Sequence, residues 1–158
     1  MKKRQKKLRA GTFQLLENWE ISTVNHHTGE ILETEKKTNL IVNAGLEYAA
    51  KLLNGVHATY FRAIAIGTDA TAAANEQTAL VAEYTRALAT LSYEASYIAK
   101  FTKTFEFGSG VAEDIVEAGI LDNNVSGGNM LARATFAAKS VSADVDLIVT
   151  AEITLSRV

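Results

Sequence analysis

The stretch NAGLEYAAKLLNG, residues 43–55, decides the fold. Asn43 can cap the start of a helix with its side-chain oxygen, and Gly55 stands where helices often end in a left-handed residue. Between these two residues one apolar stripe recurs at helical spacing, formed by Leu46, Ala49, Ala50 and Leu53. We therefore predict one α-helix at about residues 44–54. A stripe this narrow needs a sheet to lie on, so we expect the helix to plug or cover a β-rich domain.

Outside this helix, apolar residues recur with a period of two, which is typical of strands with one buried face. The longest such run is formed by Val145, Leu147, Val149, Ala151, Ile153 and Leu155. A second run lies near the start of the chain, where Glu17 interrupts an apolar face formed by Phe13, Leu15, Trp19 and Ile21. Residues 24–29 predict a turn, and the mostly polar residues 30–37 predict a return strand at an edge.

The middle of the chain predicts further strands and one long loop. Residues 60–66 alternate only loosely and are apolar on both faces from Ala63 onward, as in a strand that is covered on two sides. Residues 67–78 are small and polar and predict a loop, with one helical turn near residues 79–82. Two long strands are expected next, at residues 87–93 and 97–107. A further strand is expected at 114–121, with its return strand at 130–137.

Residues 122–129, DNNVSGGN, are rich in side chains that tolerate turn conformations, and they predict a hairpin. Eight or nine strands joined by short turns around one helix predict a mainly β fold, namely an antiparallel β-sandwich or barrel.

Composition supports one folded domain. The chain has 158 residues, of which 47% are hydrophobic and 22% are charged. We expect a basic arm at residues 1–12 and a single β-rich domain at residues 13–158. The basic start lacks the long apolar segment of a signal peptide, and no stretch predicts a membrane span. The chain contains no cysteine, which excludes disulfides and thiolate metal sites.

Charge is distributed unevenly along the chain. Six of the first nine residues are basic, namely Lys2, Lys3, Arg4, Lys6, Lys7 and Arg9. Because the net charge is −2 overall, the remaining chain carries −8. Three interpretations of the arm stay open: a solvated tail, a contact with an acidic surface of a neighbouring protein, or a contact with nucleic acid. The arm lacks the aromatic residues that stack on bases.

No catalytic motif is present, and we predict a protein that is not an enzyme and that uses no cofactor and no metal. The adjacent histidines His26 and His27 have no third ligand nearby in sequence, so they are expected to be loop residues. His57 has no evident partner and is interpreted as a turn residue. The residues Asp122, Asn123 and Asn124 are weak candidates for calcium ligands. Asp144 and Asp146 are expected to be solvated carboxylates on the polar face of the last strand.

Five short motifs in a fixed order give the chain a resemblance. They are Thr38–Leu46 (TNLIVNAGL), Ile64–Thr68 (IAIGT), Glu117–Leu121 (EAGIL), Met130–Phe136 (MLARATF) and Thr150–Leu155 (TAEITL). In this order and spacing the chain resembles small structural proteins of tailed bacteriophages, which are described as tail-fibre-like, neck or capsid-accessory modules. The resemblance covers roughly residues 38–155 and leaves out the basic arm.

The resemblance implies a protein without catalytic residues that works by being bound in place in a virion. On this basis we expect a tail- or neck-associated or capsid-decorating subunit whose partners are other virion proteins and copies of itself. The arm would dock on a neighbouring virion protein. The alternative is a nucleic-acid-binding protein that uses the same arm.

Overall fold

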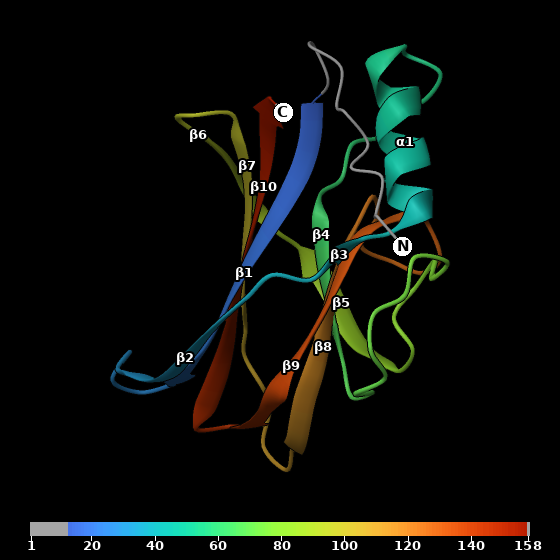
Figure 1. Cartoon of the computed structure of the whole chain (residues 1–158). Helices are drawn as coiled ribbons and strands as arrows, with labels where there is room; N and C mark the ends of the chain where they lie inside the picture. Colours follow the sequence, from blue (N-terminus) through green and yellow to red (C-terminus); the bar gives the residue numbers. More distant parts are fainter. Residues whose placement is uncertain (1–12, 158) are drawn as a thin grey trace, which may run out of the picture.

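Two layers of antiparallel strands and one helix make up the computed structural model, which describes residues 13–157 (Figure 1). The first layer contains, in order, β2 (Ile31–Lys37), β1 (Phe13–Asn25), β10 (Val145–Arg157), β7 (Ile98–Phe105) and β6 (Thr90–Glu94). The second contains β3 (Leu40–Ile41), β9 (Met130–Ser142), β8 (Ala112–Leu121), β4 (Ala63–Gly67) and β5 (Glu83–Leu88). Among the described residues, strand pairing joins the two layers only where β9 meets β10, at Ser142 and Val145. The sheet does not close into a barrel, so the predicted mainly β fold is confirmed in its sandwich form.

The core lies between the two layers and follows the predicted alternation. On β10 the inward residues are Leu147, Val149, Ala151 and Ile153, all of them buried. Trp19 and Ile21 of β1 and Phe101 and Phe105 of β7 join the same cluster. Leu155 continues the alternation but is exposed, because it lies at the open end of the sandwich.

The chain crosses between the layers at both edges of the sandwich. At one edge, β2 ends at Lys37 and the chain reaches β3 in the other layer after two connecting residues. At the opposite edge, the single strand predicted at residues 87–93 is wrong, because the chain forms β5 and β6 in different layers. The break is at Ala89, whose N–H donates to the carbonyl of Arg62 at 2.9 Å.

The predicted helix is confirmed as α1 (Asn43–Leu53), but its start and its buried face differ from the prediction. Val42 occupies the N-cap position and makes no side-chain capping bond, so Asn43 does not cap the helix. Gly55 has a φ of +74° just after the helix, as predicted. The buried helical residues are Gly45 and Tyr48, whereas the apolar stripe is mostly exposed at Leu46 and Leu53.

The remaining strands are found where predicted, but β4 begins at Ala63 and not at residue 60, and β9 continues to Ser142. The β1–β2 hairpin lies at an edge, β4 is buried throughout, and β8 and β9 are joined by the predicted turn. Residues 68–82 form a loop over the outer side of the second layer, without the helical turn expected at residues 79–82. Leu80 of this loop packs on a small second cluster with Val42, Ala65, Leu121 and Met130.

Candidate functional site

The basic arm, with Lys2, Lys3, Arg4, Lys6, Lys7 and Arg9, lies outside the described residues. The rest of the chain is acidic, since it holds all eighteen acidic residues and ten of the sixteen basic ones. The arm joins the sandwich at Phe13, at the same end as α1 (Figure 1).

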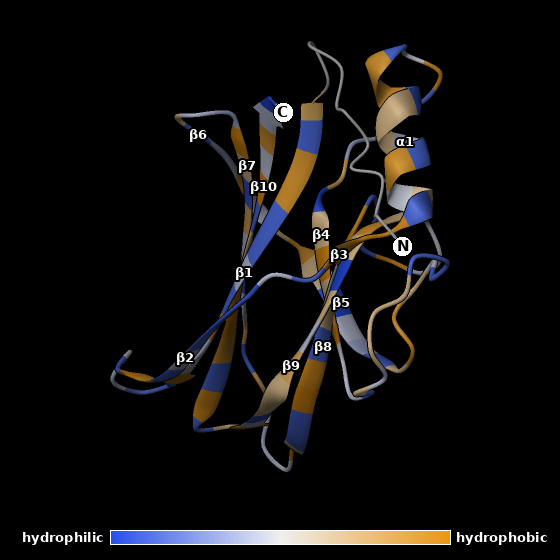
Figure 2. Ribbon diagram, viewed as in Figure 1, coloured by the Kyte–Doolittle hydropathy of each residue, from blue (hydrophilic) through white to orange (hydrophobic). Residues whose placement is uncertain are grey.

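An open apolar groove of about 560 Å³ occupies the helix end of the sandwich. We call it the helix-end groove, and its principal lining residues are Phe13, Leu46, Leu53, Phe101, Ile153 and Leu155. They come from α1, from the start of β1, from the end of β10 and from β7, and Figure 2 shows hydrophobic residues on α1 and on the first part of β1. The groove is therefore an uncovered end of the hydrophobic core.

Two local features keep this end open. A side chain at Gly45 would meet the backbone oxygen of Leu131, so the helix is seated on β9 by its glycine and not by its apolar stripe. In addition, β2 pairs with β1 only from Trp19 onward, because the chain then leaves for the other layer. Among the described residues, the first half of β1 consequently pairs as a strand only with β10.

The tip of the β6–β7 hairpin stands beside the groove and carries two exposed tyrosines, Tyr93 and Tyr97. Tyr97 lines a hollow together with Phe13, Leu53 and Leu155, so the tip adjoins the groove. Ser96 and Tyr97 both have positive φ, at 72° and 68°, which is uncommon for residues other than glycine. An aromatic residue held in this conformation and left exposed is typical of a contact surface rather than of a core.

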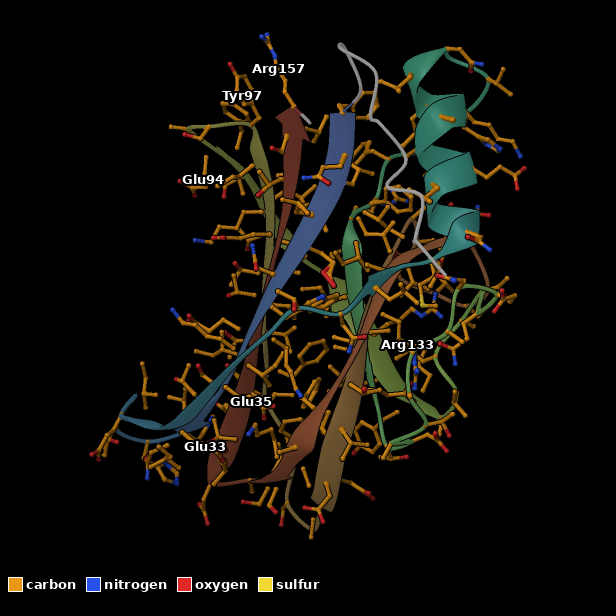
Figure 3. All side chains as sticks on the ribbon, viewed as in Figure 1. Glu33, Glu35, Glu94, Tyr97, Arg133 and Arg157 are labelled. Carbon is orange, nitrogen blue, oxygen red and sulfur yellow. The ribbon has the colours of Figure 1, made fainter. Side chains whose placement is uncertain are left out.

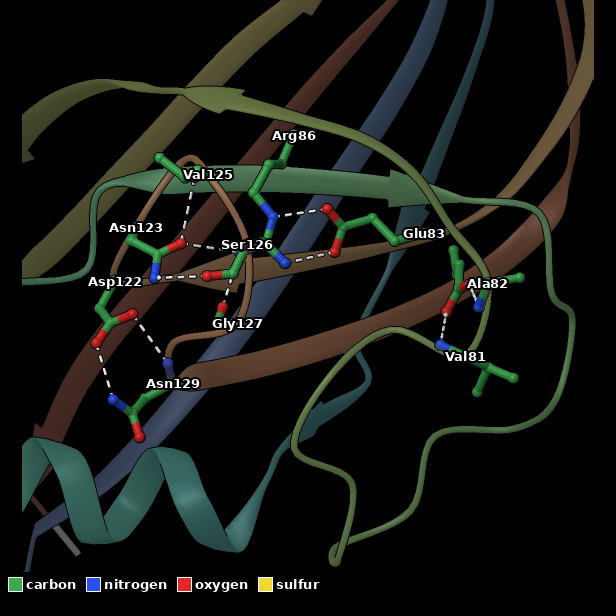
Figure 4. Close-up of polar contacts among 11 residues, drawn as sticks. Val81, Ala82, Glu83, Arg86, Asp122, Asn123, Val125, Ser126, Gly127 and Asn129 are labelled. Carbon is green, nitrogen blue, oxygen red and sulfur yellow. Dashed lines mark hydrogen bonds and ion pairs between the residues drawn. The ribbon is translucent and has the colours of Figure 1, made fainter.

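A buried ion pair fastens the loop 68–82 to the sheet. Arg133 donates from Nε to Glu117 Oε2 at 2.8 Å, and both side chains are fully buried. Arg133 also donates to the carbonyl of Thr71, and the amides of Val81 and Ala82 donate to the Glu117 carboxylate (Figures 3 and 4). Every partner here is part of the loop or the sheet, so the pair is structural.

The hairpin loop at residues 122–129 is closed by its own side chains. The Asp122 carboxylate accepts bonds from the backbone N–H and the side-chain amide of Asn129, both at 2.9 Å (Figure 4). Arg86 reaches the loop at Asn123 and Gly127. Burial alone would raise the pKa of Asp122, but the two bonds from Asn129 lower it. Asn123 Oδ1 likewise accepts bonds from Arg86 and from the backbone N–H of Val125.

Each of the two loop histidines pairs with an aspartate, either Asp144 just before β10 or Asp146 within it. His26 Nδ1 lies 3.0 Å from Asp146 Oδ2, and His27 Nε2 lies 2.9 Å from Asp144 Oδ1. The expectation that Asp146 is solvated is wrong, because it is buried beneath His26. The pairs join the β1–β2 turn to the β9–β10 turn.

Ion pairs between Lys139 of β9 and two glutamates of β2 join the layers at the β2 edge. The Lys139 ammonium of β9 is buried and lies 2.5 Å from a Glu33 oxygen and 2.9 Å from a Glu35 oxygen (Figure 3). Glu35 also accepts the backbone N–H of Ala137. Bonds to both carboxylates raise the pKa of Lys139 in spite of its burial.

Residues 13–157 contain no group of three or more histidine, cysteine, aspartate or glutamate side chains placed to hold a metal. His57 follows the turn after α1 and stacks on Tyr48, with ring centroids 4.4 Å apart. None of the helices within the described part of the chain is both long and apolar enough to cross a membrane. Comparison of the chain with protein-family models, with curated proteins and with solved structures found no match.

Sequence reasoning found part of the helix-end groove. The apolar stripe with Leu46 and Leu53 was recognised but assigned to the core. The exposed positions Phe13 and Leu155 were assigned to buried faces by their parity, and Tyr97 was assigned to the face of Phe101. The signal that distinguishes them is position: each lies at the end of its strand or hairpin, beyond the span that the opposite layer covers.

Proposed function

We propose that the chain is a non-enzymatic structural subunit of a bacteriophage virion, attached to the tail or neck or decorating the capsid. The observation that supports this most directly is the combination of a rigid antiparallel sandwich with a large apolar surface at one end. Soluble monomers rarely expose a contiguous apolar patch of this kind without a contact to make. The resemblance at residues 38–155 supplies the virion context.

The basic arm is the second attachment element of this proposal. Lys2, Lys3 and Arg4, with the three further cations, carry six positive charges on twelve residues, whereas the body is acidic. Because like charges repel and opposite charges steer binding, the arm would dock on an acidic surface of a neighbouring virion protein. Such a contact is sensitive to salt.

The experiment is to produce particles in which the chain lacks residues 1–12 and to measure how much of it is incorporated. A chain with all six cations replaced by glutamine is the matched control for length. We expect both variants to fold, because the core residues lie within 13–157, and to be lost from particles. Normal incorporation of both would refute the role of the arm.

Nucleic-acid binding by the arm is the alternative function, and the same concentration of cations supports it. The purified full chain would then bind DNA with a steep dependence on salt, and the glutamine variant would not. The net charge of −8 on the rest of the chain opposes this alternative, because it repels phosphate. DNA binding that is tight at about 0.05 M salt, falls steeply by about 0.2 M and is lost in the glutamine variant would favour it.

A further inference from the structure

The helix end of the sandwich presents a hollow and a projection side by side. The hollow is the helix-end groove, and the projection is the β6–β7 tip with Tyr93 and Tyr97. Tyr93 lies opposite Ala99 in the ladder, and Ala99 lines the groove. Since residues directly opposite each other point to the same face, Tyr93 lies on the groove side of its sheet.

We propose that a second copy of this chain docks on this end through a two-fold axis, so that the tyrosine tip of each copy enters the helix-end groove of the other. This names the surface for the self-association part of the proposed function, on which it rests. A two-fold contact requires a patch that contains its own complement. The groove and the adjoining tip meet this requirement within one surface.

The area is that of a stable dimer. The large side chains of this surface, Phe13, Leu46, Leu53, Tyr93, Tyr97 and Leu155, are exposed by 44% to 78%. At about 200 Å² for each large side chain, they expose together about 700 Å². A standard interface buries about 800 Å² on each partner, so a modest polar rim completes it.

Charge at the rim suits a reciprocal contact as well. Glu94, at the end of β6, and Arg157, at the end of β10, lie at this same end (Figure 3). Within residues 13–157 neither side chain forms an ion pair. Across a two-fold axis, Glu94 of each copy can pair with Arg157 of the other.

The composition of residues 1–12 argues against this segment as the occupant of the groove. Burying even some of its six cations against Phe101 and Ile153 would leave charges without partners in an apolar surrounding. An acidic or basic partner protein is disfavoured for the same reason. A second copy brings tyrosines, which are large and apolar and carry a hydroxyl for the rim.

The test measures the mass of the purified full-length chain by sedimentation velocity over a range of concentrations. We expect the wild-type chain to dimerise, and Leu53→Glu to weaken dimerisation at least tenfold. Val125→Glu is the matched control, because Val125 is as exposed as Leu53, at 79% against 78%, but belongs to the β8–β9 loop and does not line the groove. Equal effects of both variants would overturn the inference.

A charge reversal tests the two-fold geometry itself. Glu94→Arg should weaken the dimer by placing two cations together, and adding Arg157→Glu should restore it. A failure of the double variant to recover would overturn the two-fold contact. A monomeric wild-type chain that still enters particles would overturn the dimer and leave the virion role standing. A dimer that never enters particles would refute the virion role and leave the dimer.

Discussion

Glu17 is a carboxyl group placed among apolar side chains on the inward face of β1. It is 6% exposed, and burial raises its pKa to about 6, although a bond from the backbone N–H of Asn39 acts in the opposite direction. Its second oxygen and the Nε1 of Trp19 have no hydrogen-bond partner in the part of the chain that the structure describes. The folded protein therefore holds the proton of Glu17 up to a higher pH than the unfolded chain does.

Glu17→Gln should make the protein more stable at neutral pH. A raised pKa means that the folded state binds the proton more tightly than the unfolded state. The contribution of Glu17 to stability is therefore fully present below pH 4.5 and is lost as the pH rises through about 6. Above pH 6 the variant should gain about 1 to 2 kcal/mol in free energy of unfolding. Urea denaturation at pH 4.5 and 7.5 measures this. Glu20→Gln, on the outward face, is the control, and an equal gain there would contradict the explanation.

Arg133 poses the opposite problem, because its removal leaves a buried anion. Arg133→Met should lower the free energy of unfolding by about 3 to 5 kcal/mol, since Glu117 loses its counter-ion in a fully buried site. Adding Glu117→Gln should recover part of the loss. Chemical denaturation of the single and double variants measures both effects, and a loss below about 1 kcal/mol would show that the loop amides alone hold the carboxylate.

The sequence predicted the direction of these side chains better than their partners. Alternation placed Trp19 and Ile21 inward, and by the same rule it placed Glu17 there, although its charge made it look like an exception. The partner of Arg133 among loop carbonyls and the burial of Asp146 by His26 depend on segments more than 50 residues away. Such contacts have no local pattern.

At the scale of elements, one glycine sets the position of the helix. A Cβ at Gly45 would lie 2.2 Å from the backbone oxygen of Leu131, and a strand cannot yield as a flexible side chain does. Gly45→Ala should therefore destabilise the protein by about 1 to 3 kcal/mol, in spite of the better helix propensity of alanine. Gly55→Ala is the control for a glycine after the helix, where positive φ alone costs about 1 kcal/mol. Thermal unfolding measures both. A smaller loss of stability at Gly45 than at Gly55 would contradict the close contact between Gly45 and Leu131.

The pair of His26 and Asp146, which joins the β1–β2 turn to β10, should contribute to stability in a pH-dependent way. A hydrogen bond and the charge of Asp146 raise the pKa of His26, with smaller contributions from Glu106 and Asp144 and with His27 packed edge-on beside it. Its contribution to stability is therefore present below pH 6.5 and is lost as the pH rises through the raised pKa.

His26→Gln should remove this loss, so that the midpoint of thermal unfolding changes less between pH 6 and pH 8.5 than in the wild-type chain. The control is His27→Gln, which breaks an exposed pair of little energetic weight. An unchanged pH profile in the His26 variant would show that the pair with Asp146 does not contribute to stability.

Elements with a clear period could be predicted, and their connections could not. β10 and β1 followed from alternation alone. The division of residues 83–94 between two layers was missed because Ala89 carries no turn signal such as glycine or proline. The helix was predicted correctly, but its apolar stripe lines a groove and not the core. Whether such a stripe is buried depends on where the strands beneath it end, and the local sequence does not show this.

At the scale of the whole molecule, the chain has two proposed contact surfaces of different chemistry, one apolar and one charged. The helix-end groove offers apolar surface, whose contribution to binding does not depend on charge. The arm with Lys2, Lys3, Arg4, Lys6, Lys7 and Arg9 offers charge, and its contacts are screened as salt rises. The two can therefore be distinguished in one titration.

Raising the salt from 0.1 M to 1 M shortens the screening length from about 10 Å to about 3 Å. We expect binding of the chain to particles that lack it to fall steeply over this range, and binding of the variant with six glutamines to be weak throughout. The dimer of the full chain should persist at 1 M, because burial of Leu53 and Tyr97 involves no charge and the Glu94–Arg157 contact lies at the rim. Sedimentation and particle binding measured on the same samples give both curves. A dimer that dissociates with the same salt dependence as particle binding would mean that the arm, and not the groove, joins the copies.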